Sequence, residues 1–165
     1  MNIVNEINEN GYYIIKNYFT EEECNNVIQN INKNKNKFVK SIINKNIFGS
    51  GNDLRYPNFQ NIDKYSKKFL NDKTIHNLFE KILKRKILKK RCQAGFVKYN
   101  NKERICSGGG WHIDNKDIQL KAMIYLNDVN SKNGPFTIIK NTPSGLNLPN
   151  TIGDKSKTRF DNKII

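Results

Sequence analysis

The hydrophobic pattern of the chain changes near Ile87, and this change constrains the fold more than any other feature. Before it, apolar residues recur at helical spacing; after it, short apolar segments alternate with Gly, Asn, Asp and Pro. Strands are expected over Ile87–Cys92, Gly95–Tyr99, Gln119–Leu126 and Phe136–Lys140. The pattern predicts a mainly β fold with N-terminal helices, as one domain over 1–165, helical over 1–86 and β over 87–165.

Within the first half, local signals place individual elements. Gly11–Ile15 is rich in aromatic and β-branched residues and is expected to form a short strand. Thr20 and Glu23 have the spacing of a capping box, which predicts a helix from there to about Asn32. Helices are also expected over about 62–70 and 73–84, and loop over the Lys/Asn-rich residues 33–60.

The chain is strongly basic, with 29 Lys and Arg against 15 Asp and Glu and a net charge of +14. Such an excess suits an anionic partner such as nucleic acid. However, lysine supplies most of it, and Lys, Asn and Ile are over-used along the whole chain, which favours a solvated surface. The densest run, 84–91, is interrupted by Ile87-Leu88 and is interpreted in the same way.

The sequence also bears on the compartment. No window is apolar enough to span a membrane, and the N-terminus has no signal-peptide pattern. The three cysteines are widely spaced and form no CxxC, so neither a disulfide framework nor a zinc site is expected. A cytoplasmic protein is the expectation.

A histidine and an aspartate two residues apart are the strongest candidate for a chemical site. Alternate side chains of an extended segment project from the same side, so His112 and Asp114 can approach one ion together. An imidazole and a carboxylate are two of the three ligands in the facial triad that holds non-haem Fe(II). Gly108–Gly110 precede the pair and leave room for a co-substrate. Taken alone, a His-x-Asp pattern is common by chance.

In its wider context the pair resembles the phytanoyl-CoA dioxygenase-like family of Fe(II)/2-oxoglutarate-dependent oxygenases. Three blocks carry the resemblance in order and at fitting spacing: Trp111–Asp114, Lys121–Val129 and Asn133–Ile139. Gly11–Thr20 and the helix after it are similar to the family's opening strand and helix. The resemblance implies a double-stranded β-helix, a jelly-roll or cupin-like barrel with the metal at one open end.

The resemblance also implies roles for individual residues. His112 and Asp114 would bind Fe(II), and Lys121 would pair with a carboxylate of 2-oxoglutarate. Weaker co-substrate candidates are Lys98, Tyr125 and Asn133, and Trp111 is a candidate wall of the substrate pocket. Each of these residues also has a purely structural interpretation. Lys121 and Lys98 can be solvated surface residues, Asn133 a turn residue and Trp111 a core residue.

Two further residues of the family pattern have no counterpart here. The family's third iron ligand is a histidine on a late strand, followed by an arginine or similar residue that pairs with 2-oxoglutarate. His112 is the last histidine, and Arg159 comes too early for the arginine. His76 lies in a predicted helix and is interpreted as a surface or packing residue. We therefore expect a C-terminally truncated member whose barrel lacks its late strands.

The resemblance implies an enzyme that uses dioxygen to hydroxylate a C–H bond of a small molecule while 2-oxoglutarate is decarboxylated to succinate. An alternative stays open, namely a catalytically incomplete binding module whose basic surface engages an anionic partner such as nucleic acid. The two hypotheses differ in their requirements. The enzyme needs iron, whereas the module predicts steep salt dependence of nucleic-acid binding without iron.

Overall fold

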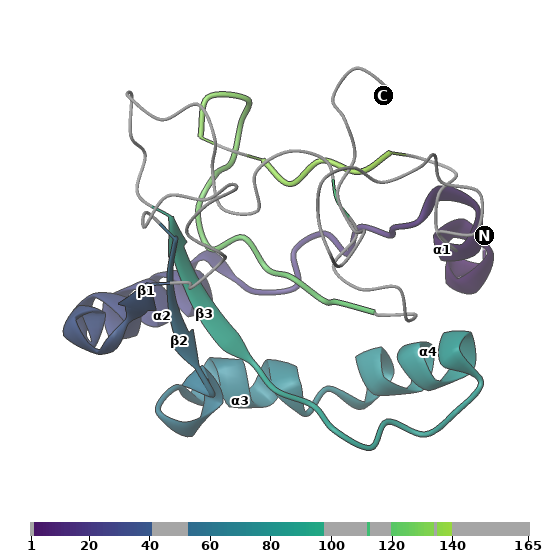
Figure 1. Ribbon diagram of the computed structural model, residues 1–165, viewed down its shortest axis with the longest axis horizontal. Coiled ribbons are helices and arrows are strands. Elements are labelled where there is room, and N and C mark those ends of the chain that lie inside the picture. Colours follow the sequence, from purple (N-terminus) through teal and green to yellow (C-terminus); the bar gives the residue numbers. More distant parts are fainter. Residues whose placement is uncertain (1, 41–52, 98–111, 113–119, 134, 140–165) are drawn as a thin grey trace.

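The computed structural model describes residues 2–40, 53–97, 112, 120–133 and 135–139, which combine helices with a small antiparallel sheet (Figure 1). The elements, in chain order, are α1 (Ile3–Asn10), α2 (Glu21–Lys33), the 3-10 turn η1 (Lys35–Lys37), β1 (Val39–Lys40), β2 (Asp53–Pro57), the 3-10 turn η2 (Phe59–Asn61), α3 (Lys64–Leu70), α4 (Lys73–Leu83) and β3 (Gln93–Val97). None of the helices in this part of the chain is long and apolar enough to cross a membrane.

The sheet has the strand order β1-β2-β3, and both strand pairs are antiparallel. In the longer pair, Arg55 lies opposite Gly95 and Leu54 lies opposite Phe96. Because side chains alternate along a strand, the two faces of the sheet differ. Leu54 and Phe96 pack against the core, and Arg55 lies on the other face.

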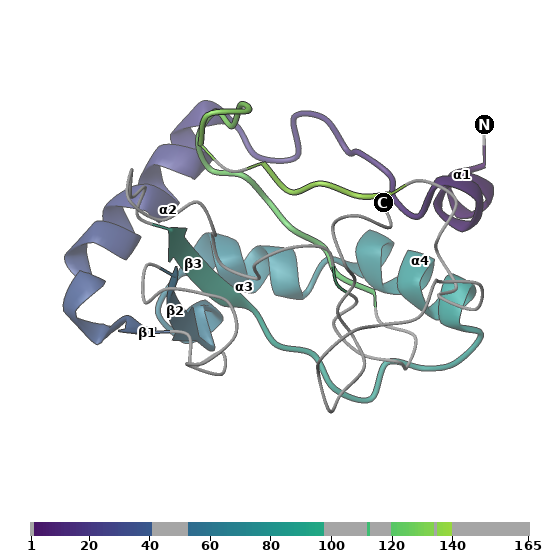
Figure 2. The ribbon, with the colours of Figure 1, turned by 45° about the horizontal axis from the view of Figure 1, so that its top comes forward.

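The core lies between α2 and the sheet. Val27 and Ile31, four residues apart on α2, pack with Phe38 and Phe59, and Phe59 is fully buried. Leu126, from the segment that follows the candidate site, packs against the same cluster. The core therefore holds the C-terminal described segment against the N-terminal half of the chain, as Figure 2 shows from a second direction.

The structure confirms the three helices expected in the first half. Each of them begins after a residue whose side chain caps it. Thr20 and Glu23 form the predicted capping box at the start of α2. Asp63 accepts from the Ser66 amide at α3, and Asp72 accepts from the Thr74 and Ile75 amides at α4.

The beginning of the chain differs from expectation, since α1 was not predicted and Gly11–Ile15 forms no strand. The Asn2 side chain accepts from the Val4 amide and caps α1. Gly11 has a φ of 84° and its amide returns to the Ile7 carbonyl. A residue in this left-handed conformation ends a helix, so Gly11 acts as a C-terminal cap and does not open a strand.

The prediction of a strand over Ile87–Cys92 was also wrong, and side chains explain why. The Ile87 amide donates to the Glu80 carboxylate and the Cys92 amide donates to the Gln60 side chain. These amides are therefore not available for a sheet ladder. The next predicted strand forms two residues earlier than expected, as β3, and its partner β2 lies within the segment expected to be loop.

The last two predicted strands are absent from residues 120–126 and 136–139 as the structure describes them. Here the Phe136 amide donates to the Tyr125 hydroxyl, where a strand pair would use a backbone carbonyl. In the described part of the chain, helix thus exceeds strand, contrary to the expected mainly β fold. Most of the expected β-helix core, 87–165, lies outside the described residues.

Candidate metal and co-substrate site

His112 is the one described member of the predicted iron-binding pair. It forms an isolated β-bridge, so its backbone is extended there, and its side chain is exposed. An exposed imidazole is a suitable donor for a borderline metal ion such as Fe(II). Asp114, Trp111 and Lys98 lie outside the described residues. No group of three His, Cys, Asp or Glu side chains gathers among the residues that are described.

His76 takes no part in this region. Its Nε2 lies 2.7 Å from the Leu70 carbonyl oxygen, and a carbonyl oxygen can only accept, so Nε2 carries the proton. The imidazole of His76, a residue of α4, is therefore hydrogen-bonded to the last residue of α3. This contact agrees with the interpretation of His76 as a surface or packing residue.

Asn133 lies in a turn whose hydrogen bonds use both ends of its carboxamide. Its Nδ2 donates to the Asp128 carbonyl at 3.0 Å, and its Oδ1 accepts from the Asn130 amide at 2.6 Å. The Asn130 side chain accepts in turn from the Lys132 amide. This network supports the turn interpretation of Asn133.

Tyr125 lies before this turn and Phe136 after it. The Tyr125 hydroxyl accepts from the Phe136 amide at 2.7 Å, and both side chains are exposed. Lys121 and Met123, four and two residues before Tyr125 respectively, are exposed as well. Ala122 is exposed too, so exposure here does not alternate with period 2, and a shared inward face of Lys121, Met123 and Tyr125 stays a prediction.

The surroundings of Lys121 disfavour its charged form. Its side chain reaches the surface, yet neighbouring atoms shield its ammonium group from water, and this desolvation lowers the pKa of Lys121. The positive charges of Arg55 and Arg91 lower that pKa further. A cation whose protonation is disfavoured in this way gains more than an isolated lysine does when an anion binds beside it.

The sheet accounts for the position of Arg55, and Arg91 lies just before β3. Arg55 lies opposite Gly95, on the face away from the core. Arg91 lies two residues before the start of β3, and its side chain is exposed. A Cβ built on Gly95 meets no atom of the described residues within 4 Å, so the surface next to Arg55 is open in the described part.

Sequence reasoning missed Arg55 and Arg91 as neighbours of Lys121. A usable signal was their rarity, since the chain contains five arginines and 24 lysines. A planar guanidinium suits carboxylate recognition better than an ammonium does, so a rare arginine merits attention. The effect of their charges on Lys121 still depends on the folded structure, which the sequence does not reveal.

Comparison with known proteins identifies one family. A sequence model of the phytanoyl-CoA dioxygenase (PhyH) family matches residues 7–159, which include all three blocks around the candidate site. No curated protein and no solved structure matches the chain. Proteins of this family are Fe(II)/2-oxoglutarate-dependent dioxygenases, and the family implies a double-stranded β-helix fold and a small-molecule substrate. Because the match covers nearly the whole chain, the protein belongs to the phytanoyl-CoA dioxygenase (PhyH) family.

Proposed function

We propose that this protein is an Fe(II)/2-oxoglutarate-dependent dioxygenase that hydroxylates a C–H bond of a small molecule. The observation that carries the proposal is the family match over residues 7–159, because it includes the His-x-Asp pair as well as the blocks around it. His112 and Asp114 are two iron ligands in this proposal. The chemistry of this donor set suits Fe(II), since an imidazole and a carboxylate are two members of the facial triad.

Fe(II) and 2-oxoglutarate, when bound, supply the activation of dioxygen and the electrons for it, with release of succinate and carbon dioxide. The protein's own residues bind and orient these groups. His112 and Asp114 hold the metal. Lys121 is the proposed partner of a 2-oxoglutarate carboxylate, and Tyr125, Asn133 and Lys98 stay weaker candidates for that role. Trp111 is proposed to wall the substrate pocket.

The cations around Lys121 support its proposed role. Arg55 and Arg91 lie close enough to Lys121 for their charges to act on it. Since 2-oxoglutarate is a dianion, a carboxylate beside Lys121 would favour its ammonium form and oppose the effects that lower its pKa. A charge-assisted hydrogen bond to Lys121 would also orient the co-substrate.

Anaerobic titration with Fe(II) and 2-oxoglutarate tests the proposal, with the visible charge-transfer band of the chelate as the readout. The wild-type chain is expected to give the band, and Asp114→Ala is expected to lose it. Lys121→Ala should keep the band at saturating 2-oxoglutarate but need about tenfold more of it, because one charge-assisted hydrogen bond is lost. Lys132→Ala, which removes an exposed lysine within the turn, is the matched control.

The outcomes separate the hypotheses. A wild-type chain without the band contradicts the proposal that this chain assembles the site. If such a chain also bound nucleic acid with steep salt dependence, the binding-module alternative would be favoured. A band that survives in Asp114→Ala would show that Asp114 is not a ligand.

A further inference from the structure

The segment between α4 and β3 forms an exposed basic loop, defined here as residues 84–91. In both views it leaves α4 and follows the outer edge of the molecule (Figures 1 and 2). Every cation in the loop is exposed: Lys84, Arg85, Lys86, Lys89, Lys90 and Arg91. Lys73 and Lys81, exposed on α4, extend the positive surface.

Leu88 lies in the middle of this loop with 96% of its surface exposed, more than any other large apolar side chain among the described residues. Its neighbour Ile87 is half-buried, so the two side chains point in different directions. A single exposed leucine is ordinary on a protein surface. A leucine with three cations before it and three after it in one exposed loop is a different feature.

Specific contacts fix the loop in this conformation. The Glu80 carboxylate accepts from the Ile87 amide at 3.0 Å and from the Lys86 ammonium at 3.3 Å. Beyond Leu88, the Lys90 ammonium donates to the Asn71 side chain at 2.8 Å. Because the loop is tied on both sides, Leu88 is presented outward with little conformational entropy left to lose on binding.

We propose that the basic loop docks the protein on an anionic lipid surface, with its cations at the headgroups and Leu88 inserted among the acyl chains. Cations and an apolar side chain on one exposed loop match the two layers of a membrane interface. The proposed binding is peripheral, because the loop offers one leucine and its cations to the lipid surface. It does not require the proposed catalytic function, although Arg91 of the loop is also one of the two arginines whose charges act on Lys121.

A lipid surface fits the loop better than a nucleic acid does. Proteins that bind single strands combine cations with aromatic side chains on which bases stack, and the loop sequence Lys-Arg-Lys-Ile-Leu-Lys-Lys-Arg contains none. Phosphate contacts alone would leave Leu88 in water. Insertion into a membrane removes its apolar surface from water, so Leu88 distinguishes the two partners.

Sedimentation with vesicles tests the proposal on the full chain. We expect binding to vesicles of phosphatidylcholine mixed with phosphatidylserine, and little binding to phosphatidylcholine alone. Leu88→Ser should weaken the binding roughly tenfold, as expected for the loss of one inserted leucine. The double variant Arg85→Glu/Lys89→Glu should weaken it by at least about twentyfold, since each cation near the surface contributes about fivefold.

Matched controls change the same chemistry elsewhere. Lys33→Glu/Lys37→Glu makes the same change in net charge at the end of the molecule that holds α2 (Figure 1). Ile14→Ser removes another exposed aliphatic side chain, and Ile14 is 65% exposed. Both controls should bind the mixed vesicles within about twofold of wild type, because neither touches the loop.

Three results would overturn the proposal. One is wild-type protein that stays in solution with the mixed vesicles. Another is equal loss of binding in the loop and control charge variants, which would indicate attraction by net charge alone. The third is binding of a DNA duplex in preference to the mixed vesicles, lost in Arg85→Glu/Lys89→Glu and unchanged in Leu88→Ser. Circular dichroism of each variant confirms that it is folded.

Discussion

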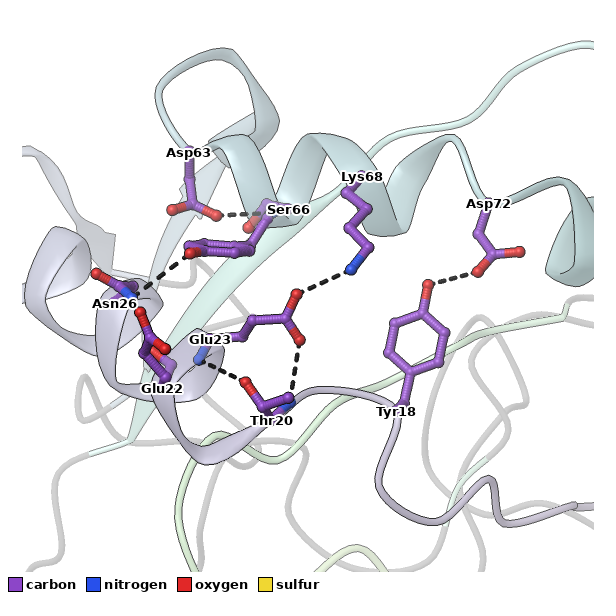
Figure 3. Close-up of polar contacts among 10 residues, drawn as sticks. Tyr18, Thr20, Glu22, Glu23, Asn26, Asp63, Ser66, Lys68 and Asp72 are labelled. Atoms are coloured by element: carbon purple, nitrogen blue, oxygen red, sulfur yellow. Dashed lines mark hydrogen bonds and ion pairs between the residues drawn. The ribbon is translucent and has the colours of Figure 1, made fainter.

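The Tyr18 hydroxyl donates a 2.6 Å hydrogen bond to the Asp72 carboxylate, 54 residues further along the chain (Figure 3). Asp72 also caps α4, where it accepts from the Thr74 amide at 2.7 Å. One carboxylate therefore joins the segment before α2 to the first turn of α4. The Tyr18 ring also packs edge-on against Phe69 of α3. The pair thus connects three elements that are distant in sequence.

Replacing Tyr18 with phenylalanine should remove the hydrogen bond and keep the ring packing. We expect the free energy of unfolding to fall by about 1–2 kcal/mol, as for a hydrogen bond to a partly exposed charged acceptor. Urea unfolding measures the change. Tyr13→Phe is the matched control because Tyr13 is exposed, and it should change stability by less than about 0.5 kcal/mol. Equal stability of Tyr18→Phe and wild type would contradict the role of this pair.

The same pair predicts a pH dependence. The hydrogen bond from Tyr18 lowers the pKa of Asp72, and the Ile75 and Thr74 amides lower it further, against the opposing effect of burial. A carboxyl whose pKa is lower in the folded state stabilises the fold above its unfolded pKa, and this stabilisation is lost as the pH falls through the folded value. The free energy of unfolding should therefore decline below about pH 4.

Tyr18→Phe should show a smaller decline over the same acidic range, since the largest cause of the shift is gone. Tyr18 affects the pH dependence of stability at alkaline pH. Burial and the hydrogen bond to Asp72 raise the pKa of Tyr18, so its contribution is present below about pH 10 and is lost as the pH rises through the folded value. Urea unfolding at a series of pH values measures the free energy of unfolding in both the acidic and the alkaline range. Parallel acidic limbs in the two proteins would contradict the assignment.

The start of α2 is stabilised by a separate group of contacts (Figure 3). The Thr20 hydroxyl accepts from the Glu23 amide at 3.1 Å, and the Glu23 carboxylate accepts from the Thr20 amide at 3.0 Å. Thr20→Ala should therefore lower the free energy of unfolding by about 1 kcal/mol. Thr20→Ser keeps the capping oxygen and should stay close to wild type. If the serine variant lost as much stability as the alanine variant, the threonine methyl group and not the cap would be responsible.

The helices could be predicted because their signals are local. Thr20 and Glu23 are three residues apart, and the cap depends on little else. The strand β2 could not be predicted in the same way, because its pairing of Arg55 with Gly95 joins positions 40 residues apart. At Ile87 an apolar segment was interpreted as a strand, but the Glu80 carboxylate binds its amide. The alternation of apolar and polar residues does not show that a side chain, and not a neighbouring strand, will bind a backbone amide.

Of the candidate site, the turn at Asn133 could be predicted, because turn chemistry is a local property. The roles of His112 and Lys121 stay predictions from motif spacing. The sequence did not identify Arg55 or Arg91, which act on Lys121 in the folded structure. Long-range electrostatics of this kind depends on strand register, and one sequence without its pairing partners does not contain that information.

The cations around Lys121 lead to a prediction that does not depend on iron. Desolvation is the largest cause of the lowered pKa of Lys121, followed by the charges of Arg55 and Arg91. Arg55→Gln should therefore raise that pKa without restoring its ordinary value, because the desolvation persists. Titration of the chain carrying isotope-labelled dimethyl groups on its lysines, followed by NMR, measures the shift. Adding 2-oxoglutarate without metal should raise the pKa of Lys121 and leave Lys132 unchanged, since a bound carboxylate favours the ammonium form. If 2-oxoglutarate gave the charge-transfer band with Fe(II) but left the Lys121 resonance unmoved, Lys121 would not be its partner, whereas His112 and Asp114 would keep their proposed roles.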